Sequence, residues 1–261
     1  MNIGTGKDLD EYSVMHKQIP YHLIDICEPG EKFLLPDFQR EFDRVFKEIT
    51  KRNSTPILCG GTGLYIDAIL NNYANTQIPE NLELREKLQN LSLDHLRELY
   101  INSPKKDQYS PDLSTKKRAI RAIEINNYLK NNTLNSKNKI DFKPIIFGIN
   151  IDREQRRQKI TERLRDRLSS GLIEEVEELI KTGISPEVLK YYGLEYKFVT
   201  EYLEGSLSRK ELFRRLEIGI HQYAKRQMTW FRKMEKNGIK INWIDASTPE
   251  KDKLAEIKNL L

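Results

Sequence analysis

The chain has 261 residues, of which 38% are hydrophobic and 32% are charged, a composition typical of a globular protein with a modest core. It carries 44 Lys and Arg against 39 Asp and Glu, and the resulting net charge of +5 permits nucleic-acid binding without requiring it. No apolar run approaches the roughly 20 residues that span a bilayer, and the start does not resemble a signal peptide, so we expect a cytoplasmic protein. Two distant cysteines and four histidines without ligand spacing argue against a disulfide scaffold or a structural zinc site.

The first part of the chain alternates between segments typical of strands and of helices, which predicts an α/β fold. Residues 21–26 are a short apolar run before a Pro-Gly turn and predict a strand. Residues 37–52 carry apolar side chains at helical spacing. Residues 56–59 predict a buried strand, which passes through a glycine-rich turn at residues 60–63 into a further helix.

The composition changes near residue 78, where a polar, helical region begins. Its last part, residues 130–139, is rich in Asn, Lys and Ser and has the composition of an exposed, mobile connection. We expect the whole region to be a helical insertion into an α/β core. The chain then divides into a first core part, the insertion and a second core part, at residues 1–77, 78–141 and 142–261.

The second core part begins with residues 144–151, an apolar run that predicts a core strand. A helix is predicted over residues 153–170, with Asp152 as its N-cap. Ser208 begins a capping-box pattern for a long helix that ends near a glycine. Residues 239–244 predict the last strand of the core.

The turn at residues 60–63 follows a predicted strand, and open α/β sheets bind their ligands at such strand ends. Gly60 and Gly61 let a ligand approach the backbone, the following helix N-terminus favours anions, and Thr62 offers a hydroxyl. The alternative is an ordinary strand-to-helix turn with Thr62 as N-cap, which is favoured when the turn is considered alone.

Two basic helical segments are candidates for phosphate binding. Arg118 and Arg121 open an apolar helix and share one face, although an exposed basic face explains them equally well. In the helix from residue 153, Arg156 and Arg163 project to the same side, and arginine binds diphosphate oxygens in a bidentate manner. Neighbouring carboxylates could instead pair with these arginines on an exposed face, an alternative that composition alone favours.

Residues 223–232 interleave aromatic and basic side chains along a predicted helix. Tyr223, Gln227 and Trp230 share one face, and Arg226 falls on another. Aromatic rings can stack unpaired bases while Lys and Arg hold the nucleic-acid strand. The alternative places the aromatic rings in the core with snorkelling cations, and it is slightly favoured without further context.

Taken in order, these segments resemble the tRNA dimethylallyltransferase family, also called isopentenyl-diphosphate:tRNA transferases, over most of the chain. Residues 2–7 (NIGTGK) resemble that family's D-I-G-T-x-K segment, and residues 21–25 (YHLID) its P-H-x-L-D strand. Residues 58–65 (LCGGTGLY) match its V-G-G-T-x-x-Y turn, and residues 118–121 match its R-x-x-R helix. The most specific match is that of residues 225–232 (KRQMTWFR) to K-R-Q-x-T-W-[FL]-R.

The resemblance implies a P-loop-type parallel-sheet core with a helical insertion. It implies an enzyme that transfers a dimethylallyl group from dimethylallyl diphosphate to N6 of the adenosine 3′ of the anticodon, with Mg²⁺ as cofactor and the tRNA anticodon stem-loop as partner. Thr62 would lie near both substrates beside Gly60 and Gly61, and Arg163 would bind diphosphate; we expect a monomer without membrane contact. The residues that would contact tRNA are Gly4, Thr5, Lys7, Arg85, Lys117, Arg118, Arg121, Gly193, Lys197, Lys225, Arg226, Gln227, Trp230 and Arg232.

The sequence departs from the family pattern in three places. It contains no G-x-x-x-x-G-K-[ST] motif, so we expect that roughly one βαβ unit, on the order of 45 residues, is missing before Met1. That unit would hold the diphosphate cradle, the magnesium-binding hydroxyl and the carboxylate that resembles the general base. Asn2 replaces the usual Asp, and residues 193–197 (GLEYK) are a looser version of G-Y-[KR].

The missing unit predicts unpaired sheet edges and an exposed apolar slot in the core. It also leaves two alternatives to an active transferase. One is an inactive tRNA-binding remnant, and the other is a half-protein that needs a separate N-terminal partner.

Overall fold

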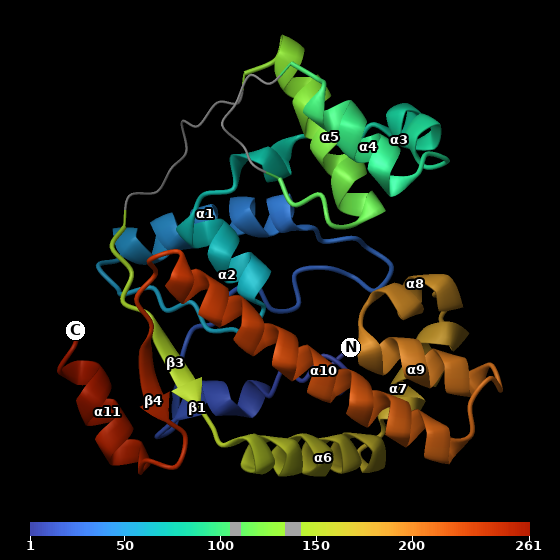
Figure 1. Cartoon of the computed structure of the whole chain (residues 1–261). Helices are drawn as coiled ribbons and strands as arrows, with labels where there is room; N and C mark the ends of the chain where they lie inside the picture. The colour runs from blue at the N-terminus through green and yellow to red at the C-terminus, as the bar shows by residue number, and fades with distance from the viewer. Residues whose placement is uncertain (105–110, 134–141) are drawn as a thin grey trace. The chain divides into compact units, whose positions relative to one another are not determined.

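The computed structural model describes residues 1–104, 111–133 and 142–261 (Figure 1). It is a helix-rich α/β fold with little sheet, and it separates into two compact units. Most of the predicted connection at residues 130–139 lies outside the described residues. The larger unit consists of Met1–Leu34, Arg40–Ile66 and Phe142–Leu261, and the smaller unit of Leu35–Gln39 and Asp67–Asp141.

The larger unit begins with a short 3₁₀-helix, η1 (Leu9–Tyr12), and an antiparallel pair of two-residue strands, β1 (Ser13–Val14) and β2 (Lys17–Gln18). The strand predicted at residues 21–26 is wrong. Leu23 and Asp25 have φ values of 61° and 54°, and this left-handed conformation interrupts an extended chain.

The buried strand predicted at residues 56–59 is also wrong. This segment joins α1 (Leu35–Lys51) to α2 (Gly63–Leu70) without regular structure, and its Ile57 is 87% exposed. An apolar run becomes a strand only where a neighbour completes its backbone hydrogen bonds, and no strand in the described part of the chain pairs with it. The helices predicted on either side are present.

The smaller unit is helical, as the prediction of a helical region requires. Its helices bury a common core, and the last three begin at side-chain caps supplied by Asn81, Ser92 and Thr115. Buried in that core are Leu88, Leu96, Tyr100, Ala119, Ala122 and Ile123. The elements are η2 (Ala74–Gln77), α3 (Leu82–Leu88), α4 (Leu93–Ile101) and α5 (Lys116–Asn131).

The strands β3 (Phe147–Asn150) and β4 (Asn242–Asp245) pair in parallel over four residues each. They correspond to the two predicted C-terminal strands, with β3 shorter than predicted and β4 displaced toward the C-terminus. Ile244 is 1% exposed, whereas Ile149 is 57% exposed, so only β4 behaves as the predicted core strand. In the described residues the parallel sheet has these two strands instead of the larger sheet predicted.

The remaining elements of the larger unit are helices, and α6 and α10 match their predictions closely. Asp152 caps α6 by accepting from the N–H groups of Glu154 and Gln155, and Ser208 forms the predicted capping box with Glu211. Helices α8, α9 and α11 were not predicted. The helices are α6 (Arg153–Ser169), α7 (Leu172–Lys181), α8 (Pro186–Tyr191), α9 (Leu194–Leu203), α10 (Arg209–Lys236) and α11 (Glu250–Lys258).

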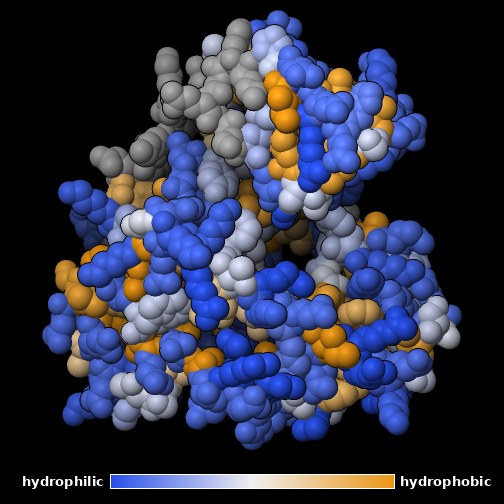
Figure 2. All heavy atoms as spheres, viewed as in Figure 1, coloured by the Kyte–Doolittle hydropathy of each residue, from blue (hydrophilic) through white to orange (hydrophobic). Residues whose placement is uncertain are grey.

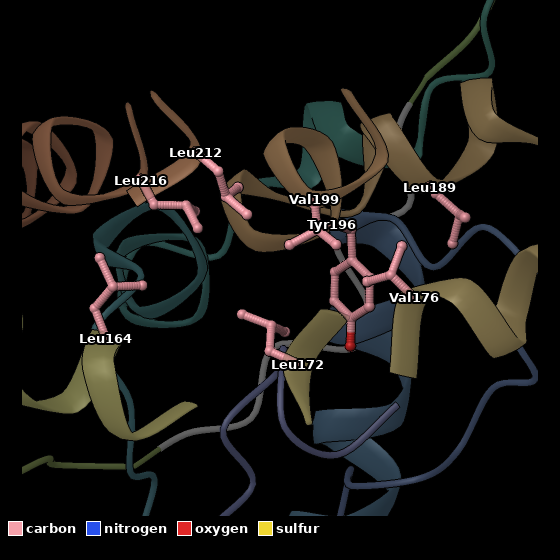
Figure 3. Packing of buried hydrophobic residues seen from close by; sticks show 8 residues of the cluster. All are labelled: Leu164, Leu172, Val176, Leu189, Tyr196, Val199, Leu212 and Leu216. Carbon is pink, nitrogen blue, oxygen red and sulfur yellow. The ribbon is translucent and has the colours of Figure 1, made fainter. Parts of the chain in front are cut away.

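Helices α6 to α10 share one apolar core, and Figure 3 shows their side chains converging on it. Helix α6 contributes one buried residue, Leu164, and the side of the helix that faces the viewer in Figure 2 is mainly hydrophilic. Among the described helices, none combines the length and apolar character that crossing a membrane requires. The core residues are Leu164, Leu172, Val176, Leu189, Tyr196, Val199, Leu212 and Leu216.

Candidate active site

The N-terminal turn, residues 2–7, is closed by its own hydrogen bonds. The Thr5 hydroxyl donates to the carbonyl of Asn2 at 3.2 Å, and the Lys7 ammonium donates to the Asn2 side-chain oxygen at 3.1 Å. Lys7 also forms an ion pair with Asp25. Two predicted contact residues, Thr5 and Lys7, are therefore already held by bonds within the protein.

A single carboxylate anchors this turn to α7. Glu175 accepts the backbone N–H groups of Asn2, Ile3 and Gly4 at 2.5, 2.9 and 3.0 Å, and the Tyr196 hydroxyl at 2.8 Å. Burial raises the pKa of Glu175, but these hydrogen bonds to its charged form outweigh burial and bring the pKa below its ordinary 4.5. Burial and the bond to Glu175 both raise the pKa of Tyr196. Gly4 lies against the Tyr196 ring, where a Cβ would collide with it.

Two arginines, one helical turn apart on α6, lie against the N-terminal turn. Arg163 forms an ion pair with Asp8, and Arg167 pairs with Glu195 of α9 at 3.3 Å. Gly6 has a φ of 61°, and a side chain there would collide with the Arg167 guanidinium. Burial, and then the charge of Arg163, lower the pKa of Arg167, which remains a cation at neutral pH. The turn thus has two guanidinium groups beside it, the side chains best suited to diphosphate oxygens.

The glycine-rich turn before α2 is held by α10. The Gln227 amide donates to the Gly61 carbonyl at 2.8 Å, and the Thr62 and Tyr223 hydroxyls lie 3.0 Å apart. Thr62 occupies the N-cap position of α2, as its alternative interpretation predicts, because its carbonyl accepts the first helical N–H groups. Its side chain is nevertheless exposed and bonded to Tyr223.

The next residue of the turn, Gly63, is buried beneath the indole of Trp230, where a Cβ would collide with the ring. Gly60 has no atom within reach of a Cβ and is exposed. The predicted shared face of Tyr223, Gln227 and Trp230 is therefore real, and it packs on this turn.

Thr62 and Arg163 belong to two separate groups of contacts in the larger unit. Thr62 is bonded to α10 through Tyr223, and Arg163 is paired with Asp8 beside the N-terminal turn. That one ligand contacts both Thr62 and Arg163 stays a prediction.

The second half of α10 also carries basic side chains at the surface. Lys225, Arg226 and Arg232 are exposed, and within the described residues they form no ion pair with a carboxylate. The Arg226 guanidinium lies 6.0 Å from the centre of the Tyr223 ring, a cation–π distance. These three cations are available to a polyanion.

In the smaller unit, Glu124 gathers two of the arginines predicted to contact tRNA. Its side chain is 1% exposed and accepts from Arg85 at 2.9 and 3.0 Å, from Arg121 at 2.6 Å and from the Asn81 N–H at 2.6 Å. Burial raises the pKa of Glu124, but the bonds from Arg85, Arg121 and Asn81 lower it further. Arg121 also donates to the Ile78 carbonyl at 2.7 Å. Both arginines therefore bind the protein itself, and their contact with tRNA stays a prediction.

The other predicted contact residues lie at the surface. Lys117 is exposed, and the exposed Arg118 pairs with Asp112 at 2.5 Å. Gly193 is the N-cap of α9, and Lys197 lies on that helix, 47% exposed.

A family model described as IPP transferase matches residues 1–234. The chain belongs to the IPP transferase family. It is 52% identical over 263 residues to tRNA dimethylallyltransferase 1 of Parabacteroides distasonis, covering 100% of this chain and 85% of the relative. It is 48% identical to tRNA dimethylallyltransferase 2 of Phocaeicola vulgatus, again over 100% of this chain and 85% of the relative. The resemblance drawn from the sequence is confirmed.

The fold of this IPP transferase family member is similar to solved structures of tRNA isopentenylpyrophosphate transferases. The full-length enzyme of Bacillus halodurans superposes with a TM-score of 0.68 at 30% identity, covering 100% of this chain and 82% of that one. The Staphylococcus epidermidis enzyme superposes with a TM-score of 0.66 at 29% identity, covering 100% and 85%.

Three residues of the candidate site were missed from the sequence. Glu175 and Tyr196 hold the N-terminal turn, and Glu195 holds Arg167. Glu195 lies in residues 193–197, the segment that departs from the family pattern, and that departure was its only signal. Nothing local marks Glu175, because the three backbone N–H groups that it accepts lie more than 170 residues away along the chain.

The described residues contain no group of three or more His, Cys, Asp or Glu side chains that could hold a metal ion. Mg²⁺ as a cofactor stays a prediction, because this ion is often held by one or two carboxylates together with substrate phosphates, and no step below is derived through it.

Proposed function

We propose that this chain transfers a dimethylallyl group from dimethylallyl diphosphate to N6 of the adenosine 3′ of the anticodon in tRNA. Its family supports this activity, because relatives about half identical over the whole chain are named tRNA dimethylallyltransferases. The observation that carries the proposal is the position of Arg163 and Arg167 together against the N-terminal turn.

The two guanidinium groups suit the chemistry of the leaving group. In the reaction the N6 nitrogen forms a bond to C1 of the dimethylallyl group while the bond from C1 to the diphosphate oxygen breaks. Both bonding electrons leave with the diphosphate, and the proton of the amine passes to a general base. Preorganised cations stabilise the charge that develops on the diphosphate, and Arg163 would reach it after exchanging Asp8 for the ligand.

The tRNA side of the reaction supports a role for α10 and Thr62. The exocyclic amine is inaccessible in a stacked loop, so the adenosine has to leave the stack. Lys225, Arg226 and Arg232 would bind the backbone of the anticodon stem-loop, and the exposed hydroxyl of Thr62 would face the adenosine.

The finer expectations from the resemblance belong to the same proposal. The larger unit would correspond to a P-loop-type core, and residues 78–141 would form its helical insertion. The remaining predicted contacts, from Gly4 to Lys197, would lie along the same tRNA, and the protein would act as a cytoplasmic monomer.

Incubation of the chain with dimethylallyl diphosphate, Mg²⁺ and unmodified tRNA tests the proposal. The expected product is N6-dimethylallyladenosine, detected by mass spectrometry of the digested tRNA. Salt-sensitive tRNA binding without product would favour the RNA-binding remnant instead. Product formed only after a separate N-terminal segment is added would favour the half-protein.

A further inference from the structure

One face of α10 holds the turn that carries Thr62. Tyr223, Gln227 and Trp230 follow one another at intervals of four and three residues, so they stack along one side of the helix. Each contacts a different residue of the turn. The Tyr223 and Thr62 hydroxyls lie 3.0 Å apart, the Gln227 amide donates a hydrogen bond to the Gly61 carbonyl at 2.8 Å, and the Trp230 indole packs on Gly63.

We propose that Tyr223 is a positioning residue that sets the direction of the Thr62 hydroxyl, and that Gln227 sets the backbone of the same turn. This inference rests on the proposed function, in which Thr62 faces the substrates. It gives Tyr223 and Gln227 of α10 a structural role in place of contact with RNA.

Tyr223 orients the Thr62 hydroxyl through the direction of the hydrogen bond between them. The 3.0 Å separation allows either hydroxyl to donate. Because a phenol is a stronger hydrogen-bond donor than an alcohol, we assign the donor role to Tyr223 and the acceptor role to the Thr62 oxygen. The Thr62 hydrogen is then left to point elsewhere. Because Thr62 is exposed, that hydrogen can donate to an acceptor on a bound substrate. Without Tyr223 the hydroxyl would rotate among its staggered positions and lose this orientation.

Trp230 contributes to this contact by packing, without a hydrogen bond. Its indole Nε1 is buried without a hydrogen-bond partner among the described residues, so packing on Gly63 holds the ring. A ring packed on the protein is not free to stack a base. The α10 face that carries Trp230 therefore serves the turn, and the exposed cations of α10 are left to serve the RNA.

The test is a double-mutant cycle on steady-state kinetics with Tyr223→Phe and Thr62→Val. Tyr223→Phe is expected to lower kcat about three- to tenfold, the effect of one neutral hydrogen bond, and to change the KM for tRNA less than about twofold. In the Thr62→Val background, Tyr223→Phe is expected to have no further effect, because the two residues act as a unit. Gln227→Met, which keeps length and loses the donor, should also lower kcat and leave the KM for tRNA unchanged.

Tyr191→Phe is the matched control, because Tyr191 is 64% exposed and its hydroxyl has no hydrogen bond in the described part of the chain. A rise in the KM for tRNA at constant kcat would make Tyr223 an RNA contact and overturn the inference. Equal losses in both backgrounds, or no loss, would overturn it as well. If the unaltered chain forms no product, both the proposed function and the positioning role fail. If the unaltered chain forms product but the Tyr223 variants behave as described in the two preceding sentences, the positioning role alone fails.

Discussion

At the scale of single residues, Arg163 and Glu175 have opposite tasks beside the N-terminal turn. Arg163 is 56% exposed and pairs with the half-exposed Asp8, a surface ion pair that contributes little stability and can exchange for a ligand. Glu175 is partly buried and fully used by four hydrogen bonds. In the proposed function the first residue would act on a substrate, whereas the second holds the N-terminal turn.

Arg163→Gln should therefore affect the reaction more than the fold. Loss of one preorganised charge from the leaving group should lower kcat by about 10²- to 10³-fold, and the melting temperature should change little. Steady-state kinetics and thermal unfolding measure the two effects. Arg157→Gln is the control, because Arg157 lies on the same helix with a similar exposure of 54%. Equal losses in the two variants would contradict the assignment.

Glu175→Gln should affect the fold. The amide has one acceptor oxygen instead of two, and its NH₂ group would face backbone N–H donors. We expect a loss of about 1.5 to 3 kcal/mol in the free energy of unfolding, the usual value for hydrogen bonds to a charged group. Denaturant titration measures it. The exposed neighbour Glu174 supplies the control, since Glu174→Gln should stay within about 0.5 kcal/mol of the unaltered chain.

At the scale of elements, α10 is one helix of 28 residues with two different sides. One side contacts the glycine-rich turn, and the other carries exposed cations. Its capping box at Ser208 fixes where the helix begins, and the period of 3.6 residues then fixes which side chains face the same way. Residues that hold the glycine-rich turn thereby fall on one side, and Lys225, Arg226 and Arg232 remain exposed. The helix thus holds the glycine-rich turn on one side and leaves the exposed cations for the RNA contact that we propose.

Replacing the exposed cations Arg226 and Arg232 by Gln should weaken tRNA binding while kcat at saturating tRNA stays the same. Each lost phosphate contact in a single-stranded region should also reduce the slope of log Kd against log salt by about 0.7. Filter binding at several salt concentrations measures both. Lys251→Gln on α11, another exposed cation, serves as the control. A slope that does not change in the double variant would exclude this face as the RNA contact.

At the scale of the whole molecule, each compact unit contains a carboxylate whose pKa is lowered by its partners. Glu175 is held in the larger unit by backbone N–H groups, and Glu124 in the smaller unit by Arg85 and Arg121. Both are ionised in the folded and unfolded chain above their ordinary pKa of 4.5. As the pH falls below 4.5, the unfolded chain takes up protons first, because its carboxylates keep the higher pKa. The free energy of unfolding therefore decreases until the pH has fallen past the pKa of the folded chain.

Acid should therefore destabilise the unaltered chain more steeply than the Glu175→Gln variant. The two free energies of unfolding should differ most near neutral pH and approach one another as the pH falls below about 4.5. Denaturant titrations from pH about 6 to about 3.5 measure this. A constant gap across that range would show that the charge of Glu175 contributes nothing.

The sequence by itself determined the features that depend on near neighbours along the chain. Capping residues marked the starts of α6 and α10, because a cap and the N–H groups it accepts lie within three residues. The periodic spacing of Tyr223, Gln227 and Trp230 determined that they share a face. The ordered motifs, above all residues 225–232, determined the family.

Only the tertiary structure decided what those faces contact. Residues 21–26 and 56–59 have the composition of strands but no strand beside them in the described residues, and pairing is a property of two segments. Glu175 reaches Asn2, and Gln227 reaches Gly61, across more than 160 residues of chain. Helical hydrogen bonds close within four residues and can be anticipated locally, whereas these contacts exist only after distant segments have packed together.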